Sequence, residues 1–115
     1  MHSEIPRAAF EVVAKQMLAA GSVEIDGHNF PIRRTSAQHL KTVKFTVDGH
    51  EYTAIEQNPD KPSRWGQLAR AGHKVIQFKD QATNRFVAVS VDGQVKEYAH
   101  GSYPFHNGPT QEKDA

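Results

Sequence analysis

The sequence contains no cysteine among its 115 residues. That absence excludes a disulfide framework, a thiolate nucleophile and a cysteine-based zinc site. No apolar run approaches the roughly 20 residues that a membrane-spanning helix requires, so we expect no membrane partner. The first residues, Met1–Glu4, lack the basic stretch followed by an apolar one that marks a secretory signal peptide. Cysteine content does not identify a compartment, and the cytoplasm is our default expectation.

The sequence also has little excess charge of either sign. Lysine and arginine number 14 and the acidic residues 13, so the net charge is +1 with seven histidines taken as neutral. No overall field would therefore draw in nucleic acid or an anionic membrane, although a local basic patch is compatible with this balance. A chain of this length forms one domain with a real core but not two. We expect that domain to span residues 1–98.

One short phrase occurs three times in the chain. It ends at Asp26-Gly27, Asp48-Gly49 and Asp92-Gly93, and an alternating apolar segment precedes it each time. This pattern is the strongest short-range signal for a β-hairpin, because the two-residue turns that match strand twist favour positive φ at their centre. Glycine reaches that region without steric cost, and aspartate reaches it more easily than most residues. Three such turns predict an antiparallel sheet of about six strands.

These turns also predict strand register. With Asp48-Gly49 as the loop, Val47 lies opposite His50 and Phe45 opposite Tyr52, and alternation gathers the apolar side chains on one face. That face comprises Val43, Phe45, Val47, His50, Tyr52 and Ala54. The first turn in the same way pairs Glu24 with Asn29 on the solvent side. The third turn allows either a two-residue loop or a three-residue loop with a bulge that pairs Val91 with Val95.

The other elements follow from helical and turn signals. Residues 6–20 predict a helix capped by Ser3 or Glu4 and closed by Gly21, with a buried stripe of Ala9, Phe10, Val13, Met17 and Ala20. Residues 33–39 predict a connection. Residues 64–72 predict a short helix capped by Asp60 or Ser63, and residues 73–80 a strand. From residue 99 the composition predicts a flexible C-terminal tail.

Together these elements predict an α+β fold in the order α-β-β-β-β-α-β-β-β. We expect one curved antiparallel sheet of about six to seven strands, built from hairpins and packed by the N-terminal helix, with a second short helix. A two-sheet or partly closed barrel arrangement is the alternative. Exposed sheet edges invite pairing with another chain, so a homodimer is a reasonable hypothesis.

The densest functional-looking chemistry lies between residues 63 and 74. The candidate partner- or anion-binding residues are Arg64, Trp65, Arg70, His73 and Lys74. Arginine donors bind phosphates and carboxylates, and an exposed tryptophan stacks on a base. The competing explanation is that Trp65 anchors the helix to the sheet while the basic residues solvate its outer face. Gly66 costs helix stability, which indicates that another group approaches the backbone there.

Other candidate chemistry is weaker. His28 and His50 follow equivalent hairpin glycines and could share a metal, but neither hairpin supplies an obvious third ligand. No nucleophile stands beside a base in a known motif, and a set such as Tyr52, Glu56 and His73 is not favoured by any spacing. The sequence therefore predicts no catalytic residues, no metal and no cofactor, and whether the protein is an enzyme stays uncertain, leaning towards a non-enzyme.

Three functions remain as expectations. The first is a small non-enzymatic interaction module that binds a protein partner, or itself, through a sheet edge or the Arg64–Lys74 surface. The second is a nucleic-acid-binding domain that uses Arg64, Trp65, Arg70 and Lys74, extended by the basic residues Arg33, Arg34, Lys41 and Lys44. The third is a small enzyme or ligand carrier with a pocket between the sheet and the first helix.

Overall fold

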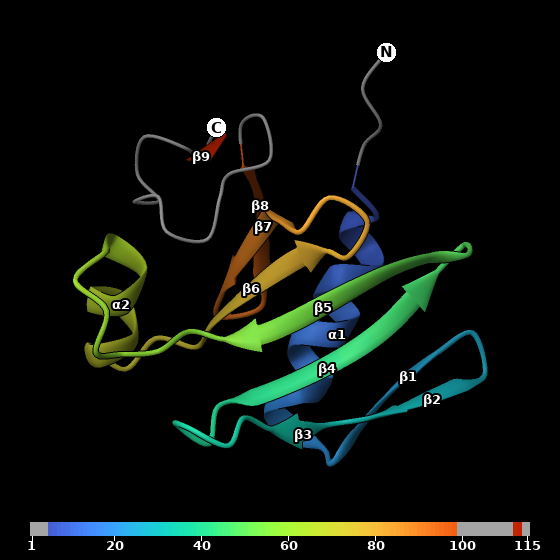
Figure 1. Ribbon diagram of the computed structural model, residues 1–115, viewed down its shortest axis with the longest axis horizontal. Coiled ribbons are helices and arrows are strands. Elements are labelled where there is room, and N and C mark those ends of the chain that lie inside the picture. Colours follow the sequence, from blue (N-terminus) through green and yellow to red (C-terminus); the bar gives the residue numbers. More distant parts are fainter. Residues whose placement is uncertain (1–4, 99–111, 114–115) are drawn as a thin grey trace.

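The computed structural model describes residues 5–98 and 112–113. The elements in chain order are α1 (Arg7–Ala19), β1 (Ser22–Ile25), β2 (His28–Pro31), β3 (Arg33–Arg34), β4 (Lys41–Val47), β5 (His50–Glu56), α2 (Arg64–Arg70), β6 (Val75–Asp80), β7 (Arg85–Val91), β8 (Gln94–Tyr98) and β9 (Glu112–Lys113). Figure 1 shows these elements as an α+β domain. Of the predicted tail, only β9 falls within the described residues. The rest of residues 99–115 lies outside them, as do Ser3 and Glu4. Helix α1 begins at Arg7 with Pro6 at its N-cap position, so the expectation that Ser3 or Glu4 caps the helix is wrong.

The strands form two antiparallel sheets. The larger one has the order β3-β4-β5-β6-β7-β8-β9 and is open at both ends, while β1 and β2 form a separate two-stranded sheet. The predicted order lacks β3, so five strands rather than four precede α2. Residues 33–39 were expected to be a connection, but Arg33 pairs with Thr42 and Arg34 with Lys41. Two paired residues are too few to leave a recognisable alternation in the sequence.

All three Asp-Gly turns are two-residue hairpin loops. Both turn residues have positive φ in each case: 51° and 80° at Asp26-Gly27, 51° and 79° at Asp48-Gly49, and 54° and 88° at Asp92-Gly93. The predicted pairs Phe45–Tyr52 and Glu24–Asn29 are confirmed. The third hairpin pairs Val91 with Gln94, which selects the two-residue loop over the bulged alternative.

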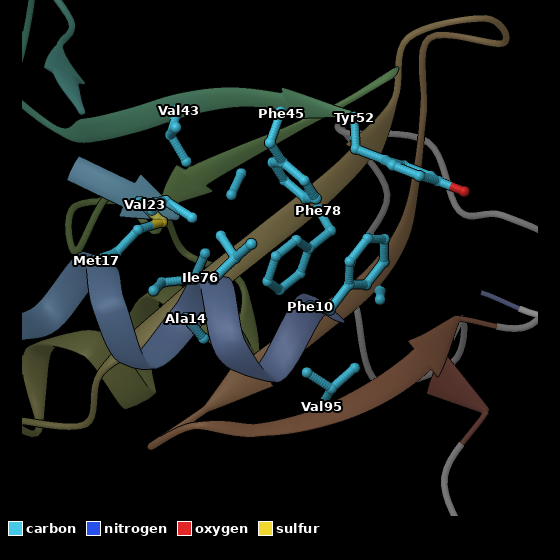
Figure 2. Close-up of a cluster of buried hydrophobic side chains, with 13 residues drawn as sticks. Phe10, Ala14, Met17, Val23, Val43, Phe45, Tyr52, Ile76, Phe78 and Val95 are labelled. Atoms are coloured by element: carbon cyan, nitrogen blue, oxygen red, sulfur yellow. The ribbon is translucent and has the colours of Figure 1, made fainter. Parts of the chain in front are cut away.

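The main core lies between α1 and the larger sheet. Phe10, Val13, Ala14 and Met17 are the buried residues of α1. Ala14 belongs to the buried face in addition to the predicted stripe, whereas Ala20 is exposed and terminates the helix. The Phe10 ring stacks on Phe78 with centroids 4.3 Å apart. Phe45 and Tyr52 meet Phe10 edge-on, an arrangement that aromatic rings favour. Figure 2 shows Phe10, Phe45 and Phe78 together between α1 and the sheet, with Tyr52 beside them.

A smaller cluster covers the opposite face of β6 and β7. It contains Trp65 of α2 together with Val75 and Val89. Because residues on a strand alternate between faces, Val75 lies on this side while its neighbour Ile76 enters the main core. These two strands are therefore covered by a helix on each face, and α2 is held close to the beginning of β6.

Side chains of α1 also cover the edges of two strands. The Gln16 amide bonds both backbone groups of Glu24 in β1, donating to the carbonyl at 3.0 Å and accepting from the N–H at 2.9 Å. On the other flank, the Arg7 guanidinium donates to the Val95 carbonyl, and the Glu11 carboxylate accepts the Val95 N–H at 3.3 Å. The helix thereby satisfies backbone groups that strand edges otherwise leave unpaired.

Candidate binding site

The segment that leads into α2 is folded tightly against the helix. The Ser63 hydroxyl accepts the Gly66 N–H at 3.3 Å, so Ser63 is the N-cap residue. A β-carbon at position 66 would overlap the carbonyl oxygen of Lys61. The group that approaches the Gly66 backbone is therefore the preceding loop. The helix ends at Arg70 with Ala71 as its C-cap residue, and the chain turns away at Gly72, the glycine expected to close the helix, which has a φ of 103°.

The structure places Trp65 in the core rather than at the surface. Only 2% of the residue is exposed, and it packs against Val75 and Val89. The Arg64 guanidinium lies 5.2 Å from the centre of the Trp65 ring. A base needs an exposed ring face on which to stack, and Trp65 does not offer one in this arrangement. Its position agrees with the structural explanation, in which the indole anchors α2 to the sheet.

Arg70 is exposed, but its guanidinium has structural partners. The Nη1 atom donates to the Pro59 carbonyl at 2.5 Å and to the Lys61 carbonyl at 3.0 Å. These two bonds tie the loop before α2 to the last turn of the helix. Arg70 therefore shapes the loop of residues 59–61 directly, whatever else it contacts.

His73 and Lys74 are positioned by the third hairpin. The His73 Nδ1 atom lies 2.7 Å from Oδ2 of Asp92, and the Lys74 N–H donates to Oδ1 of the same carboxylate at 2.9 Å. The Lys74 backbone N–H, and secondarily the His73 side chain, lower the pKa of Asp92. The sequence explains Asp92 as a turn residue. Its second role depends on contacts between distant segments and leaves no local signal.

A pocket of about 420 Å³ opens beside His73 and Lys74. His39 and Lys41 also line it, from the loop before β4 and the first residue of that strand. Its apolar lining includes Met17, Leu18, Leu40, Val75 and Ile76. We call this hollow the basic pocket, after His39, Lys41, His73 and Lys74. The basic pocket lies at the C-terminal end of α1, where Met17 and Leu18 line it. It does not lie between the helix and the sheet, because the helix packs directly onto the sheet along its buried face.

Several polar groups of the basic pocket already have partners. The Lys41 ammonium donates to the Met17 carbonyl at 3.0 Å and so caps the end of α1. The Glu56 carboxylate accepts the Lys41 backbone N–H at 3.0 Å. Among the described residues, the Lys74 ammonium and the His39 ring have no hydrogen-bond or ion-pair partner. Two residues that line the pocket therefore carry side-chain donors without a partner.

The pocket joins the two basic groups that the sequence separates. Lys41, from the first group, and Lys74, from the second, line the same hollow. Arg34 belongs to its border, since its guanidinium donates to the His39 carbonyl at 2.8 Å. His39 has a positive φ of 57°, a conformation that is uncommon outside glycine but enriched in asparagine, aspartate and histidine. The chain reverses direction before β4, and this reversal brings Lys41 to the same pocket as Lys74.

The remaining candidates do not come together. Glu56 and His73 line the basic pocket, whereas Tyr52 packs on Phe10 in the core. His50 bonds Asp80 at 2.9 Å. Within residues 5–98 and 112–113, no group of three or more histidine, cysteine, aspartate or glutamate side chains is placed to hold a metal ion.

Neither helix in the described part of the chain is long and apolar enough to cross a membrane. Comparison of the chain with protein-family models, with curated proteins and with solved structures finds no match.

Proposed function

We propose that this protein is a non-enzymatic interaction module that binds an acidic segment of a protein partner in the basic pocket. The observation that carries the proposal is the convergence of His39, Lys41, His73 and Lys74 on one hollow of about 420 Å³ with an apolar lining. Binding pockets typically combine an apolar wall with a few convergent polar groups, and their volumes start at about 300 Å³. The convergence brings together segments that are far apart in the sequence.

Free hydrogen-bond donors, rather than an excess of positive charge, favour an acidic group in this pocket, since Glu56 and Asp60 balance the charges of Lys41 and Lys74. The Glu56 carboxylate is occupied by a backbone N–H, and Asp92 is occupied by His73 and Lys74. The Lys41 ammonium uses one of its three donors on Met17, which leaves two. Hydrogen bonds between an ammonium and a carboxylate are shorter and about twice as strong as neutral ones. The free donors of the pocket therefore outnumber the acidic groups that would compete with a partner carboxylate for them.

The pocket also suits a polypeptide better than a simple anion. Asp60 contributes a carboxylate to the lining, and a peptide backbone supplies N–H donors for it, which phosphate or acetate lacks. The apolar lining, with Leu18 and Leu40, fits the non-polar part of a neighbouring side chain. Nucleic acid is the weaker candidate, because Trp65 is buried and Arg70 is bonded to the loop carbonyls.

The proposal is tested by titrating the protein with labelled probes at low and physiological salt. The probes are a glutamate-rich peptide, a lysine-rich peptide of equal length and a single-stranded oligonucleotide. We expect the acidic peptide alone to bind, more weakly at the higher salt concentration because exposed charges are screened. Lys74→Gln is expected to weaken binding by about tenfold, the equivalent of roughly 1.4 kcal/mol for one charged hydrogen bond.

A matched pair of variants on α1 locates the site. Leu18 and Val12 are the exposed large hydrophobic residues of the helix, at 38% and 43% exposure. Leu18 lines the pocket and Val12 does not. Leu18→Trp should therefore abolish binding of the acidic peptide, and Val12→Trp should leave it unchanged. Failure of the acidic peptide to bind at low salt, equal effects of the two variants, or preferential binding of the oligonucleotide would each contradict the proposal.

A further inference from the structure

The basic pocket carries carboxylates as well as basic groups. Lys41 and Lys74 line it together with Glu56 and Asp60, so the formal charges of these four side chains cancel. Glu56 is already occupied, because its carboxylate accepts the Lys41 backbone N–H at 3.0 Å. The carboxylate of Asp60 has no hydrogen-bond or ion-pair partner among the described residues. A ligand with negative charge only would leave this carboxylate without a counter-charge.

The loop that carries Asp60 begins beside the cationic wall of the pocket. The Gln57 backbone N–H donates to the Val75 carbonyl at 2.9 Å, and Lys74 is the residue directly before Val75. Figure 1 shows this loop leaving the end of β5 next to the start of β6. Asp60 and Lys74 therefore belong to adjoining segments, yet no ion pair joins them in the described part of the chain. Both charges are available to a ligand.

Hydrogen bonds hold the backbone on both sides of Asp60. Its own N–H donates to the side-chain oxygen of Asn58 at 2.8 Å. The Arg70 guanidinium donates to the carbonyls of the two neighbours, Pro59 and Lys61, and within residues 5–98 and 112–113 it forms no ion pair with the Asp60 carboxylate. The loop is thus held without neutralising that carboxylate, so a ligand binds it at a smaller entropy cost than a free loop would require.

We infer that the acidic segment bound in the basic pocket carries a basic residue beside the acidic one, and that Asp60 binds this basic side chain. The inference rests on the proposed function and names the charge pattern of the partner. The acidic side chain of the segment takes the free donors of Lys74 and His39, while the ammonium or guanidinium of its neighbour takes the Asp60 carboxylate. The volume of about 420 Å³ lies in the range of about 300–1,000 Å³ that encloses drug-sized ligands, and two side chains do not exceed that size.

Segments of a single charge sign fit the lining less well. In a segment of acidic residues only, a second carboxylate near Asp60 would meet a like charge, which disfavours binding across an interface. A segment of basic residues only would meet Lys41 and Lys74. An acidic and a basic residue side by side supply a counter-charge for Lys74 and for Asp60. Because Asp60 is exposed, its contribution is the small one of a surface ion pair.

Fluorescence anisotropy with three labelled peptides of equal length tests this inference. One peptide alternates glutamate with lysine, one glutamate with glutamine, and one glutamine with lysine, and capped ends remove the terminal charges. The titrations are made at physiological salt, where the long-range attraction between net charges is screened. We expect the glutamate–lysine peptide to bind about threefold more tightly than the glutamate–glutamine peptide, the size of one surface ion pair. The glutamine–lysine peptide should not bind.

A matched pair of variants assigns the preference to Asp60. Asp60→Asn should weaken binding of the glutamate–lysine peptide about threefold, the same surface ion pair, and should not weaken binding of the glutamate–glutamine peptide. The control is Asp26→Asn, which changes the net charge equally at a position that does not line the pocket. It should leave the preference intact. Circular dichroism and melting temperature confirm that both variants are folded.

Equal affinity of the wild-type protein for the two glutamate-containing peptides overturns the inference. So does a preference that Asp60→Asn leaves intact, or one that Asp26→Asn also removes. Failure of the proposed function has a different outcome, because neither glutamate-containing peptide would then bind the wild-type protein, and both proposals would fall together.

Discussion

Asp92 bonds His73 through one carboxylate oxygen and the Lys74 backbone through the other, at 2.7 Å and 2.9 Å. The Asp92 backbone N–H also donates to the Lys74 carbonyl at 2.8 Å. One turn residue therefore both reverses the third hairpin and positions the wall of the basic pocket. Asp92 therefore belongs both to the hairpin, which the sequence predicts, and to the candidate site, which the sequence predicts only in part.

Asp92→Asn should lower the melting temperature more than Asp26→Asn does. Both positions have φ near 50° and precede a turn glycine, and asparagine is well tolerated in such turns. The Asp26 side chain has no hydrogen-bond or ion-pair partner among the described residues, so it serves as the control for the turn itself. Equal melting temperatures for the two variants would contradict the positioning role of Asp92.

The effect of Asp92 should depend on pH. Hydrogen bonds from Lys74 and His73 hold the pKa of Asp92 below its ordinary value of 3.8. Because the folded state binds the proton more weakly than the unfolded state, the carboxylate contributes stability that is complete above about pH 4 and is lost as the pH falls through the folded pKa. The difference in melting temperature between wild type and Asp92→Asn should therefore shrink below pH 4. A difference that grows on acidification would be inconsistent with this linkage.

Gly66→Ala should destabilise the protein although alanine is the better helix former. Alanine in a helix interior is favoured over glycine by about 1 kcal/mol, but a β-carbon at position 66 would overlap the Lys61 carbonyl. Overpacking of this kind costs roughly 1–3 kcal/mol. Gly21→Ala is the control, since no heavy atom lies within 4 Å of its β-carbon and its φ is not left-handed. We expect Gly66→Ala to lower the free energy of unfolding and Gly21→Ala not to lower it, and urea unfolding of both variants measures the two effects.

Two buried hydroxyl groups should respond differently to removal. The Ser90 hydroxyl is fully buried and has no hydrogen-bond partner among the described residues. Ser90→Ala should therefore leave the free energy of unfolding unchanged or raise it by about 1 kcal/mol. The Thr53 hydroxyl donates to the Gln81 amide oxygen at 2.6 Å, and Thr53→Val should lower that free energy by about 1 kcal/mol. Chemical denaturation measures both values, and a reversed order would refute the assignment.

Trp65→Ala should cost stability rather than only affinity. The residue is 2% exposed and packs between α2 and the strands β6 and β7. Removing a buried aromatic side chain typically costs about 3–5 kcal/mol. Leu68, on the same helix but only partly buried, should cost less when changed to alanine. Thermal unfolding separates the two, and an unchanged melting temperature for Trp65→Ala would show that the indole is not an anchor.

The hairpins were predictable because their signals are local. Asp48-Gly49 carries its turn geometry in two residues, and alternation on either side then determines that Phe45 faces Tyr52. A two-sheet arrangement was expected only as the alternative, and the separate β1–β2 sheet was not assigned to this hairpin. Its strand β2 ends at Pro31, which has no N–H to donate to β4. The effect of this proline depends on which edge of the strand faces β4, and that is known only once β3 has paired with Lys41 and Thr42.

The candidate site was predictable only in part. The cluster of basic residues around α2 was recognised, and the anchoring explanation for Trp65, which is buried, was one of two that the sequence left open. The pairing of Lys41 with Lys74 across one pocket arises from the strand order β4-β5-β6 and the position of α1. Contacts of this kind join segments distant in the sequence and leave no periodicity to detect.

The most direct test of the proposed function is an amide-resolved NMR titration of the isotope-labelled protein with the glutamate-rich peptide. If the proposed function is right, the chemical-shift changes will saturate and will be concentrated at residues 38–41, 56–60 and 72–76, which line the basic pocket, and Leu18→Trp will remove them. Changes confined to the outer face of α2 around Arg64, or no changes at low salt, would contradict it.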